Sequence, residues 1–256
     1  MNDRVAIVTG ASQGIGRATA IRLARDFSAI VLVARGVDGL ASAAAEVRAA
    51  GAEGLAIEQD LSLPSAADAV VAAALQAFGR IDALVNIAGA VPGVDVFEMT
   101  EAQWESGMAL KFHGARRLTL RAWDALKAFG GSIVFISGNA AENPRAGQAA
   151  IAAINAAIEA LAKAFSERGI VDGVQVNTVS PGAVMTDRRL GLLKKGAQVQ
   201  GVTVDEMKAR FVQRASIERF GQPQEIAELI AFVLSPGARW MTGTVLRMDG
   251  GEVKSV

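Results

Sequence analysis

The segment 5–26 constrains the fold more than any other part of the chain. Residues 5–8 form a short apolar run typical of a buried strand, glycines follow at positions 10, 14 and 16, and residues 17–26 repeat apolar side chains at helical spacing. A strand that breaks into glycines and restarts as a helix leaves free backbone N–H groups at the positive end of the helix dipole. The sequence therefore predicts a phosphate-binding turn over residues 9–16.

The same turn also satisfies the Gly-x-Ser-x-Gly pattern of the hydrolase nucleophile elbow, with Ser12 as the nucleophile. An elbow hydrolase needs an acid and then a histidine later in the chain. The sequence holds a single histidine, His113, and no hydrolase-like ending follows it, which disfavours this interpretation. One histidine and no cysteine also exclude a multi-histidine or thiolate metal site, so no metal is expected.

Seven apolar runs recur along the chain and predict strands, with alanine-rich helical stretches between them. They lie near residues 4–9, 29–34, 54–58, 81–85, 131–136, 173–179 and 243–247. The runs lack alternation, as expected for strands covered on both faces, and the helices between them imply parallel crossovers. The predicted fold is α/β, a single Rossmann-like, doubly wound parallel sheet of about seven strands flanked by helices. No linker or repeat divides residues 1–256, so one domain is expected.

The charge balance limits the partners. Lys plus Arg and Asp plus Glu are equal at 26 each, so no nucleic acid and no anionic membrane is expected as a partner. The apolar runs are short and the first strand starts by residue 5, which predicts neither a signal peptide nor a spanning helix. The absence of cysteine is compatible with a cytoplasmic protein.

Five segments in order resemble one known family. Residues 9–16 are similar to the Thr-Gly-x-x-x-Gly-x-Gly turn of the short-chain dehydrogenases/reductases, and residues 86–89, 177–186, 219–227 and 249–251 are similar to that family's later landmarks. The resemblance implies a nicotinamide-dependent oxidoreductase acting on a carbonyl or alcohol. It assigns dinucleotide contacts to Gly10, Ser12, Gln13, Ile15, Gly16, Arg35, Asp60, Leu61, Asn86, Ala88, Gly89, Pro181, Gly182 and Thr186.

Several of these assignments have structural alternatives. Asp60 would meet the adenine by resemblance, or it starts a loop or caps a helix. Asn86 has a sheet-stabilising role in the family. The second strand ends at Ala34 and Arg35, where NAD enzymes carry an acid, which favours NADP over NAD, with Arg17 as a second contact. Alternatively, both arginines are solvated helix-end charges.

The usual catalytic set of the family is asparagine, serine, tyrosine and lysine, and this chain contains no tyrosine. The register places Ile151 at the tyrosine position and Asn155 at the lysine position. Gly138 takes the serine position, with Ser137 beside it, and Lys111 takes the asparagine position. Lysine and asparagine have thus exchanged places.

We hypothesise that Lys111, partly desolvated, serves as acid or base, with Asn155 and Ser137 beside it. The alternative is a lysine that pairs with an acid at the surface. Glu142 is the only carboxylate in the polar segment 139–148 and is a second candidate for proton chemistry, unless that segment simply faces water. His113 is turned from Lys111 by about 200° and is expected to pack at a helix interface.

Predicted helices at 101–128 and 148–168 are alanine-rich, and family members commonly pair through them, so a homo-oligomer, dimer or tetramer, is expected. A mobile substrate loop is expected near residues 186–215, where the pattern weakens at Lys194, Lys195 and Gly196. Two functions follow. The first is an oxidoreductase with altered proton transfer, acting on a small or medium hydrophobic carbonyl or alcohol. The second is a dinucleotide-binding protein without redox catalysis, in a regulatory or assembly role.

Overall fold

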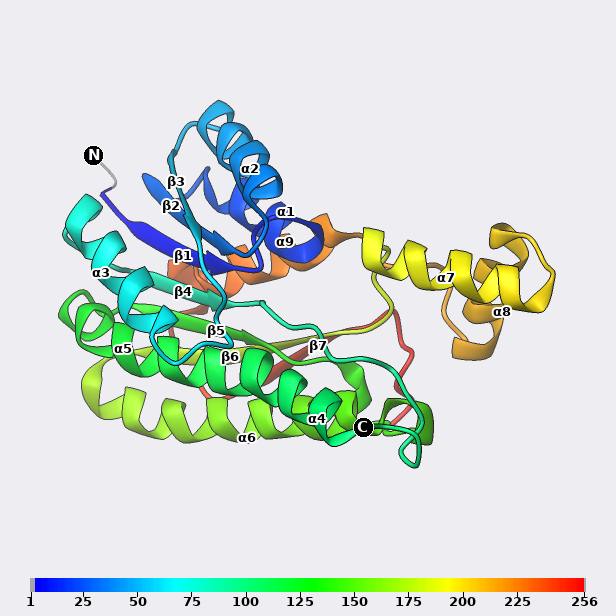
Figure 1. Ribbon diagram of the computed structural model, residues 1–256. Coiled ribbons are helices and arrows are strands. Elements are labelled where there is room, and N and C mark those ends of the chain that lie inside the picture. Colours follow the sequence, from blue (N-terminus) through cyan, green and yellow to red (C-terminus); the bar gives the residue numbers. More distant parts are fainter. Residues whose placement is uncertain (1–2, 256) are drawn as a thin grey trace.

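The computed structural model describes residues 3–255 and contains a seven-stranded sheet in the order β3-β2-β1-β4-β5-β6-β7 (Figure 1). All strand pairs are parallel. The strands are β1 (Val5–Thr9), β2 (Ala29–Ala34), β3 (Glu53–Glu58), β4 (Ala83–Asn86), β5 (Ser132–Ile136), β6 (Gln175–Pro181) and β7 (Val245–Met248). The predicted fold class is confirmed, and each predicted strand is present.

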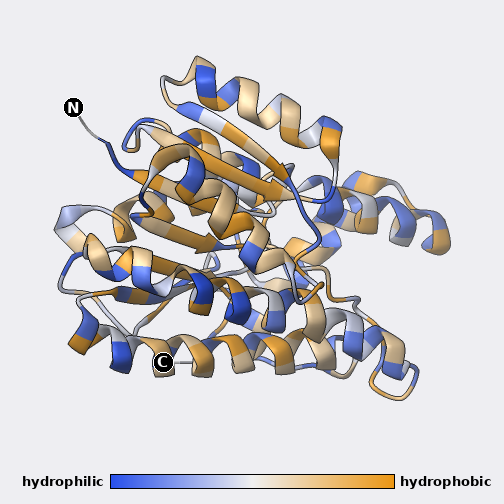
Figure 2. Ribbon diagram, turned by 60° about the vertical axis from the view of Figure 1, so that its left-hand side comes forward, coloured by the Kyte–Doolittle hydropathy of each residue, from blue (hydrophilic) through white to orange (hydrophobic). Residues whose placement is uncertain are grey.

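Helices cover both faces of the sheet. On one face lie α1 (Gly14–Leu23), α2 (Val37–Ala49) and α9 (Pro223–Val233), and on the other lie α3 (Ala66–Phe78), α5 (Ala115–Ala128) and α6 (Ala149–Asp172). Figure 2 shows that the strands between these layers are largely hydrophobic. Every residue of β1 and β5 is buried, whereas the edge strand β3 is partly exposed. Burial on both faces explains why the central strands lack alternation.

The strand order reverses direction between β1 and β4, which are neighbours in the sheet. Ligands of doubly wound sheets bind beside such a switch point, at the carboxyl ends of the strands. Thr9 ends β1 there, and its hydroxyl accepts hydrogen bonds from the backbone N–H groups of Ile87 (2.9 Å) and Ala88 (3.0 Å). One buried side chain therefore holds the loop after β4 against the glycine turn after β1.

The predicted helix 101–128 is interrupted. It begins as α4 (Glu101–Gly107), with a capping box between Thr100 and Gln103, and continues as a π-helical segment, Met108–Gly114, before α5. π-Helical turns are rare and occur frequently at functional sites. This one carries Lys111.

The segment 186–215, predicted as a loop, is instead helical. It forms α7 (Asp187–Gln200) and α8 (Val204–Ala215), which extend from the body as an arm (Figure 1). Thr186 caps α7, and Thr203 and Glu206 form a capping box on α8. Gly196, which weakened the sequence pattern, lies against Met207, since a Cβ there would be 3.4 Å from the Met207 methyl carbon. The glycine lets the two helices approach each other.

One described stretch, Ala146–Asp172, is long and apolar enough to cross a membrane by length and composition, although no spanning helix was predicted. It contains α6, whose Ile158 and Ala162 belong to the buried cluster beneath the sheet. α6 also packs along β5 and β6. These contacts are those of a core helix.

Candidate functional site

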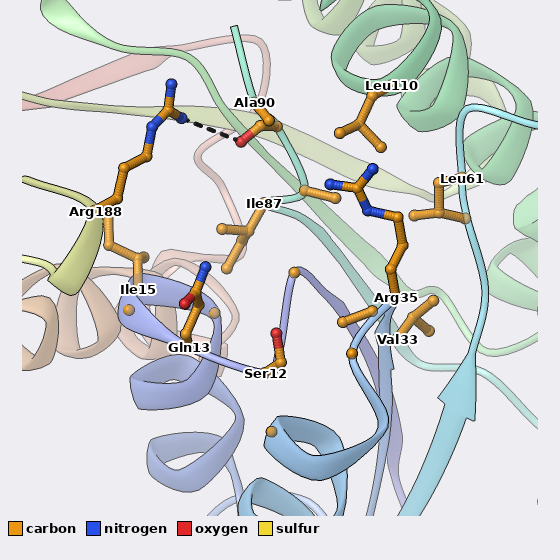
Figure 3. A pocket seen from close by; sticks show the side chains of 18 of the residues that line it. Ser12, Gln13, Ile15, Val33, Arg35, Leu61, Ile87, Ala90, Leu110 and Arg188 are labelled. Atoms are coloured by element: carbon orange, nitrogen blue, oxygen red, sulfur yellow. Dashed lines mark hydrogen bonds between the residues drawn. The ribbon is translucent and has the colours of Figure 1, made fainter. Parts of the chain in front are cut away.

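A cavity of about 620 Å³ lies over the glycine turn, and we call it the turn cavity. Figure 3 shows its wall, with Ser12 and Gln13 on one side and Arg35 and Leu61 on the other. Most residues that the resemblance assigned to a dinucleotide line it. They are Gly10, Ser12, Gln13, Ile15, Gly16, Arg35, Leu61, Ala88, Gly89 and Thr186.

The backbone of the glycine turn disfavours side chains at two positions. Gly10 has a φ of +65°, which L-residues rarely adopt, and a Cβ there would lie 3.2 Å from the Ala88 backbone. A Cβ on Gly16 would lie 2.1 Å from the Gly10 carbonyl oxygen. Helix α1 begins at Gly14, so its unpaired N–H groups lie at the edge of this cradle. The shape and the donors fit a pyrophosphate.

Asp60, Asn86, Pro181 and Gly182 do not line the turn cavity. Asp60 accepts a hydrogen bond from the Ser62 N–H at 2.9 Å, as a residue at a loop start does, and Asn86 donates to the Thr119 hydroxyl at 3.1 Å, which ties β4 to α5. Pro181 and Gly182 line the neighbouring cavity described below. Asp60 and Asn86 thus make the contacts of their structural alternatives, and their assigned dinucleotide contacts stay predictions.

The two arginines considered for NADP differ in position. Arg35 lines the turn cavity with its side chain 62% exposed, and its only ion pair within the described chain is a long one of 3.8 Å to Asp60. Arg17 instead pairs with Glu46 and donates to the Ser42 hydroxyl at 2.8 Å. Because Arg17 is held against α2 and does not line the turn cavity, the prediction of a second contact there is not supported.

A second cavity, also of about 620 Å³, adjoins the first and shares with it residues such as Gly89 and Thr186. We call it the lysine cavity, because Lys111 lies in its wall together with Ser137 and Asn155. The Lys111 ammonium donates to the Ser137 carbonyl oxygen at 3.1 Å and to the Asn155 side-chain oxygen. Three of the four predicted catalytic residues are therefore in contact, and the exchange of lysine and asparagine preserves their proximity.

Lys111 has the environment of a reactive amine. Within residues 3–255 no carboxylate lies within ion-pair distance of its Nζ, so the alternative of a lysine paired with an acid is not observed. Burial lowers the pKa of Lys111 to about 8, the positive charge of Arg188 contributes to the lowering, and Glu159 opposes the shift. Near neutral pH this amine can both give and take a proton.

Two residues of the site were not identified from the sequence. Arg188 lines both cavities and donates to the Val91 carbonyl oxygen at 2.6 Å, which holds its side chain beside the lysine cavity. Glu159 follows Asn155 by one turn of α6, and burial raises the pKa of its carboxyl group. Signals were available for both: Arg188 closely follows the Thr186 landmark, and Glu159 has the i+4 spacing from Asn155 that places two residues on one helix face.

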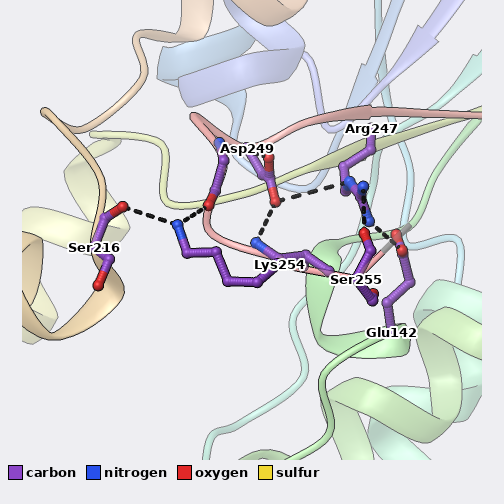
Figure 4. A network of polar contacts seen from close by, with 8 residues as sticks. Glu142, Ser216, Arg247, Asp249, Lys254 and Ser255 are labelled. Carbon is purple, nitrogen blue, oxygen red and sulfur yellow. Dashed lines mark hydrogen bonds and ion pairs between the residues drawn. The ribbon is translucent and has the colours of Figure 1, made fainter.

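Glu142 and His113 lie apart from this group. Glu142 does not line the lysine cavity and forms a 2.5 Å ion pair with Arg247 (Figure 4). His113 also does not line it, and its ring meets Phe112 edge-on with 5.2 Å between centroids. Burial lowers the pKa of His113. Glu142 is thus held in an ion pair, and the role in proton chemistry considered for it stays a prediction.

Comparison with known proteins gives the family. A family model described as Enoyl-(Acyl carrier protein) reductase matches residues 10–252. An uncharacterized oxidoreductase of Methylorubrum extorquens is 34% identical over 252 residues, covering 98% of each chain. The chain belongs to the short-chain dehydrogenase/reductase family.

Further relatives agree with this family of NAD(P)-dependent oxidoreductases. A short-chain reductase protein of Streptomyces niveus is 30% identical and covers 98% of this chain and 94% of its own. The crystal structure of L-sorbose reductase from Gluconobacter frateurii, complexed with NADPH and L-sorbose, superimposes with a TM-score of 0.95 at 30% identity, covering 100% of this chain and 98% of the other. NADPH, the cofactor bound in this structural neighbour, belongs to the nicotinamide class that the sequence predicted.

A serine at the family's serine position would require the Asn155 side chain to move. A Cβ on Gly138 would lie 2.8 Å from the Asn155 side-chain nitrogen. We expect Gly138→Ser to lower the free energy of unfolding by about 1–3 kcal/mol, the usual cost of overpacking. Asn155→Ala in the same chain removes the obstacle, so the double variant should be less destabilised than the sum of the single ones.

Urea unfolding of the wild type, the two single variants and the double variant measures this coupling. Gly147→Ser is the matched control, because Gly147 lines the same cavity and no atom lies within 4 Å of the position that its Cβ would take. Additive effects of Gly138→Ser and Asn155→Ala would contradict the expected contact.

Proposed function

We propose that this protein is an NADP-dependent oxidoreductase that reduces a carbonyl or oxidises an alcohol, with Lys111 in place of the family's tyrosine as the group that moves the proton. The observation that carries the proposal is the position of the Lys111 amine, in the lysine cavity next to the turn cavity, with its pKa lowered to about 8. NADPH-bound relatives, including L-sorbose reductase, support the cofactor.

The turn cavity fits a dinucleotide. The cradle formed by Gly10 and Gly16 would take the phosphates, and Arg35, exposed at the end of β2, would pair with the 2′-phosphate that distinguishes NADP from NAD. Thr186, shared by both cavities, lies where the nicotinamide end would pass from one to the other. When bound, the nicotinamide supplies or accepts the hydride at the substrate carbon.

Lys111 supplies the matching proton step. An ammonium group has three N–H donors, and two of them are used by the Ser137 carbonyl and the Asn155 side chain. The third remains for the substrate oxygen. In reduction the ammonium gives its proton to the oxygen that gains negative charge, and the resulting amine recovers a proton from water. In alcohol oxidation the neutral amine takes the hydroxyl proton.

A two-stage measurement tests the proposal. NADPH and NADH are titrated by fluorescence, and NADPH consumption is then followed by absorbance across a panel of ketones and aldehydes. Binding with substrate-dependent consumption supports the oxidoreductase. Binding without turnover would favour the second function, a dinucleotide-binding protein without redox catalysis, and no binding would overturn both. Unchanged ester hydrolysis in Ser12→Ala would exclude the elbow hydrolase.

Arg35 should determine the preference for NADP. We expect Arg35→Ser to weaken NADPH binding by about tenfold, the value of a charge-assisted hydrogen bond, and to leave NADH binding unchanged. Arg17→Ser is the control, because Arg17 is engaged by Glu46 away from the turn cavity. Fluorescence titrations of both nucleotides measure the effect. An equal loss for the two nucleotides would show that Arg35 does not contact the 2′-phosphate.

We infer that the protein acts in the cytoplasm as a homo-oligomer that pairs through α5 and α6. Both helices expose large apolar side chains, with Leu120 53% exposed on α5 and Ile170 and Val171 66% and 80% exposed on α6. Sedimentation equilibrium of the wild type and of Val171→Glu would test this pairing. A monomer at micromolar concentration would contradict it.

A further inference from the structure

A third cavity, of about 270 Å³, adjoins the lysine cavity and is lined by several arginines. We call it the arginine cavity, because Arg145, Arg189 and Arg214 line it. It shares Asn139, Ala140, Gly147, Gln148 and Arg189 with the lysine cavity, so the two are adjacent. A molecule bound beside Lys111 is therefore close to the arginine cavity.

The positive charges of this region are not neutralised by the protein. Among the described residues, the guanidinium groups of Arg145, Arg189 and Arg214 form no hydrogen bond or ion pair; Arg189 and Arg214 lie over the Phe211 ring at 5.2 and 5.7 Å from its centroid. Elsewhere in the described chain arginines commonly pair with carboxylates, as Arg219 does with Glu225 at 2.7 Å. Unpaired guanidinium groups gathered in one cavity are the arrangement expected of an anion site.

Among the described residues, Glu252 is the only carboxylate that lines the arginine cavity, and none that lines the lysine cavity is acidic. Burial lowers the pKa of Arg189, and Glu252 partly offsets that effect without forming an ion pair. One acid against three arginines leaves an excess of positive charge, although the whole chain has a net charge of zero. A bound anion would offset this excess.

The position of Glu252 is determined by the C-terminal segment rather than by the arginines. Figure 4 shows Arg247 and Lys254 joining that segment to its neighbours. Lys254 donates to the Ser216 carbonyl oxygen at 3.0 Å, and Asp249 accepts from the Val253 N–H at 2.8 Å. Glu252 is therefore held at one side of the cavity, and the remaining donors, including the amides of Asn143 and Gln148, line the open volume.

We propose that the arginine cavity binds an anionic group, a carboxylate or a phosphate, carried by the substrate whose carbonyl or alcohol is placed beside Lys111. This inference rests on the proposed function, which it deepens by giving the substrate class: oxo or hydroxy compounds with a negative charge at one end. Carboxylate and phosphate share the multiply accepting oxygens that a guanidinium pairs with in bidentate fashion.

Matched pairs of substrates test the proposal. The panel holds 3-oxo acids of increasing length against their methyl esters, and hydroxyacetone phosphate against hydroxyacetone, each assayed with NADPH at constant ionic strength. We expect the charged member of a pair to have a kcat/KM about tenfold to a hundredfold higher, through a lower KM. The pair with the larger ratio identifies carboxylate or phosphate as the anion.

Arg214→Met should bring that ratio close to one, through a higher KM for the charged member of each pair. Arg210→Met is the control, because Arg210 lies on the same helix and its side chain contacts Gln200, outside both cavities. Arg189→Met provides a second variant from α7. Equal kcat/KM for charged and neutral members, in wild type and variants alike, would overturn the anion site and leave the proposed function intact.

A binding measurement separates the two proposals when no compound in the panel is turned over. The protein is first saturated with NADPH, which occupies Arg35, and is then titrated calorimetrically with inorganic phosphate and with succinate. Binding that weakens about tenfold in Arg214→Met, without turnover of any substrate, would support the anion site and reject the oxidoreductase. No binding of either anion, together with no turnover, would reject both.

Discussion

Gly16→Ala is expected to abolish dinucleotide binding. The added Cβ would lie 2.1 Å from the Gly10 carbonyl oxygen and 2.6 Å from its carbonyl carbon, distances that no rotamer can relieve because every atom involved is backbone or Cβ. The turn must open, which moves the N–H groups at the start of α1 away from the phosphate position. We expect NADPH affinity to fall by more than about a hundredfold, since several charge-assisted hydrogen bonds depend on one backbone arrangement.

Gly36→Ala is the matched control for this prediction. Gly36 lines the same turn cavity, but nothing lies within 4 Å of its Cβ position, and its φ of −99° suits any residue. Fluorescence titration with NADPH compares the two variants, and urea unfolding shows whether Gly16→Ala still folds. NADPH binding by a folded Gly16→Ala at wild-type affinity would mean that the dinucleotide does not sit on this turn.

The fold could be predicted because its signal is local. The apolar runs that predicted strands reflect burial on both faces, and the structure places β1 and β5 fully inside the sheet. The arm formed by α7 and α8 was missed for the opposite reason. Its helices are stabilised by caps at Thr186 and Thr203 and by a glycine at 196 that fits the partner helix, so the residue that weakened the helical pattern serves the packing of the pair.

The candidate site, like the fold, could be predicted from the sequence only in part. The contact between Lys111 and Asn155 followed from two registers that could each be counted along the chain, and the structure joins these residues directly. The positions of Arg17 and Glu142 could not be counted, because each depends on a partner distant in sequence, Glu46 and Arg247. A charged residue can therefore be assigned to a site from the sequence only when the other residues with which it could form an ion pair are known.

The arginine cavity could not be predicted from the sequence, for a related reason. Its three arginines come from the loop after β5, from the start of α7 and from the end of α8. Nothing in their spacing indicates a shared cavity, and the segment that carries two of them was interpreted as a loop. The excess of positive charge becomes visible only when the residues that line the arginine cavity are compared with the whole chain, whose net charge is zero.

Lys111→Met is expected to lower turnover by about a hundredfold or more, the usual contribution of a general acid or base, while NADPH binding persists. Methionine keeps much of the side-chain volume over Gly89, whose Cβ position lies 3.0 Å from the Lys111 Cδ, so the loop of the turn cavity should not move. The readout is kcat for any substrate that the wild type accepts. Turnover equal to the wild type would remove Lys111 from the mechanism and with it the proposed replacement of the tyrosine.

The pH profile separates a proton-transfer role of Lys111 from a merely electrostatic one. Burial lowers the pKa of this amine to about 8, so the ammonium that reduction requires is present below that pH and is lost above it. Carbonyl reduction should therefore fall as the pH rises through about 8, and alcohol oxidation, which needs the neutral amine, should rise over the same interval. Lys111→Arg keeps the positive charge without titrating in this range, so its residual reduction should be independent of pH there. If Lys111→Arg instead retained full activity with an unchanged pH profile, the positive charge alone would account for the effect, and the proton would have to come from another group.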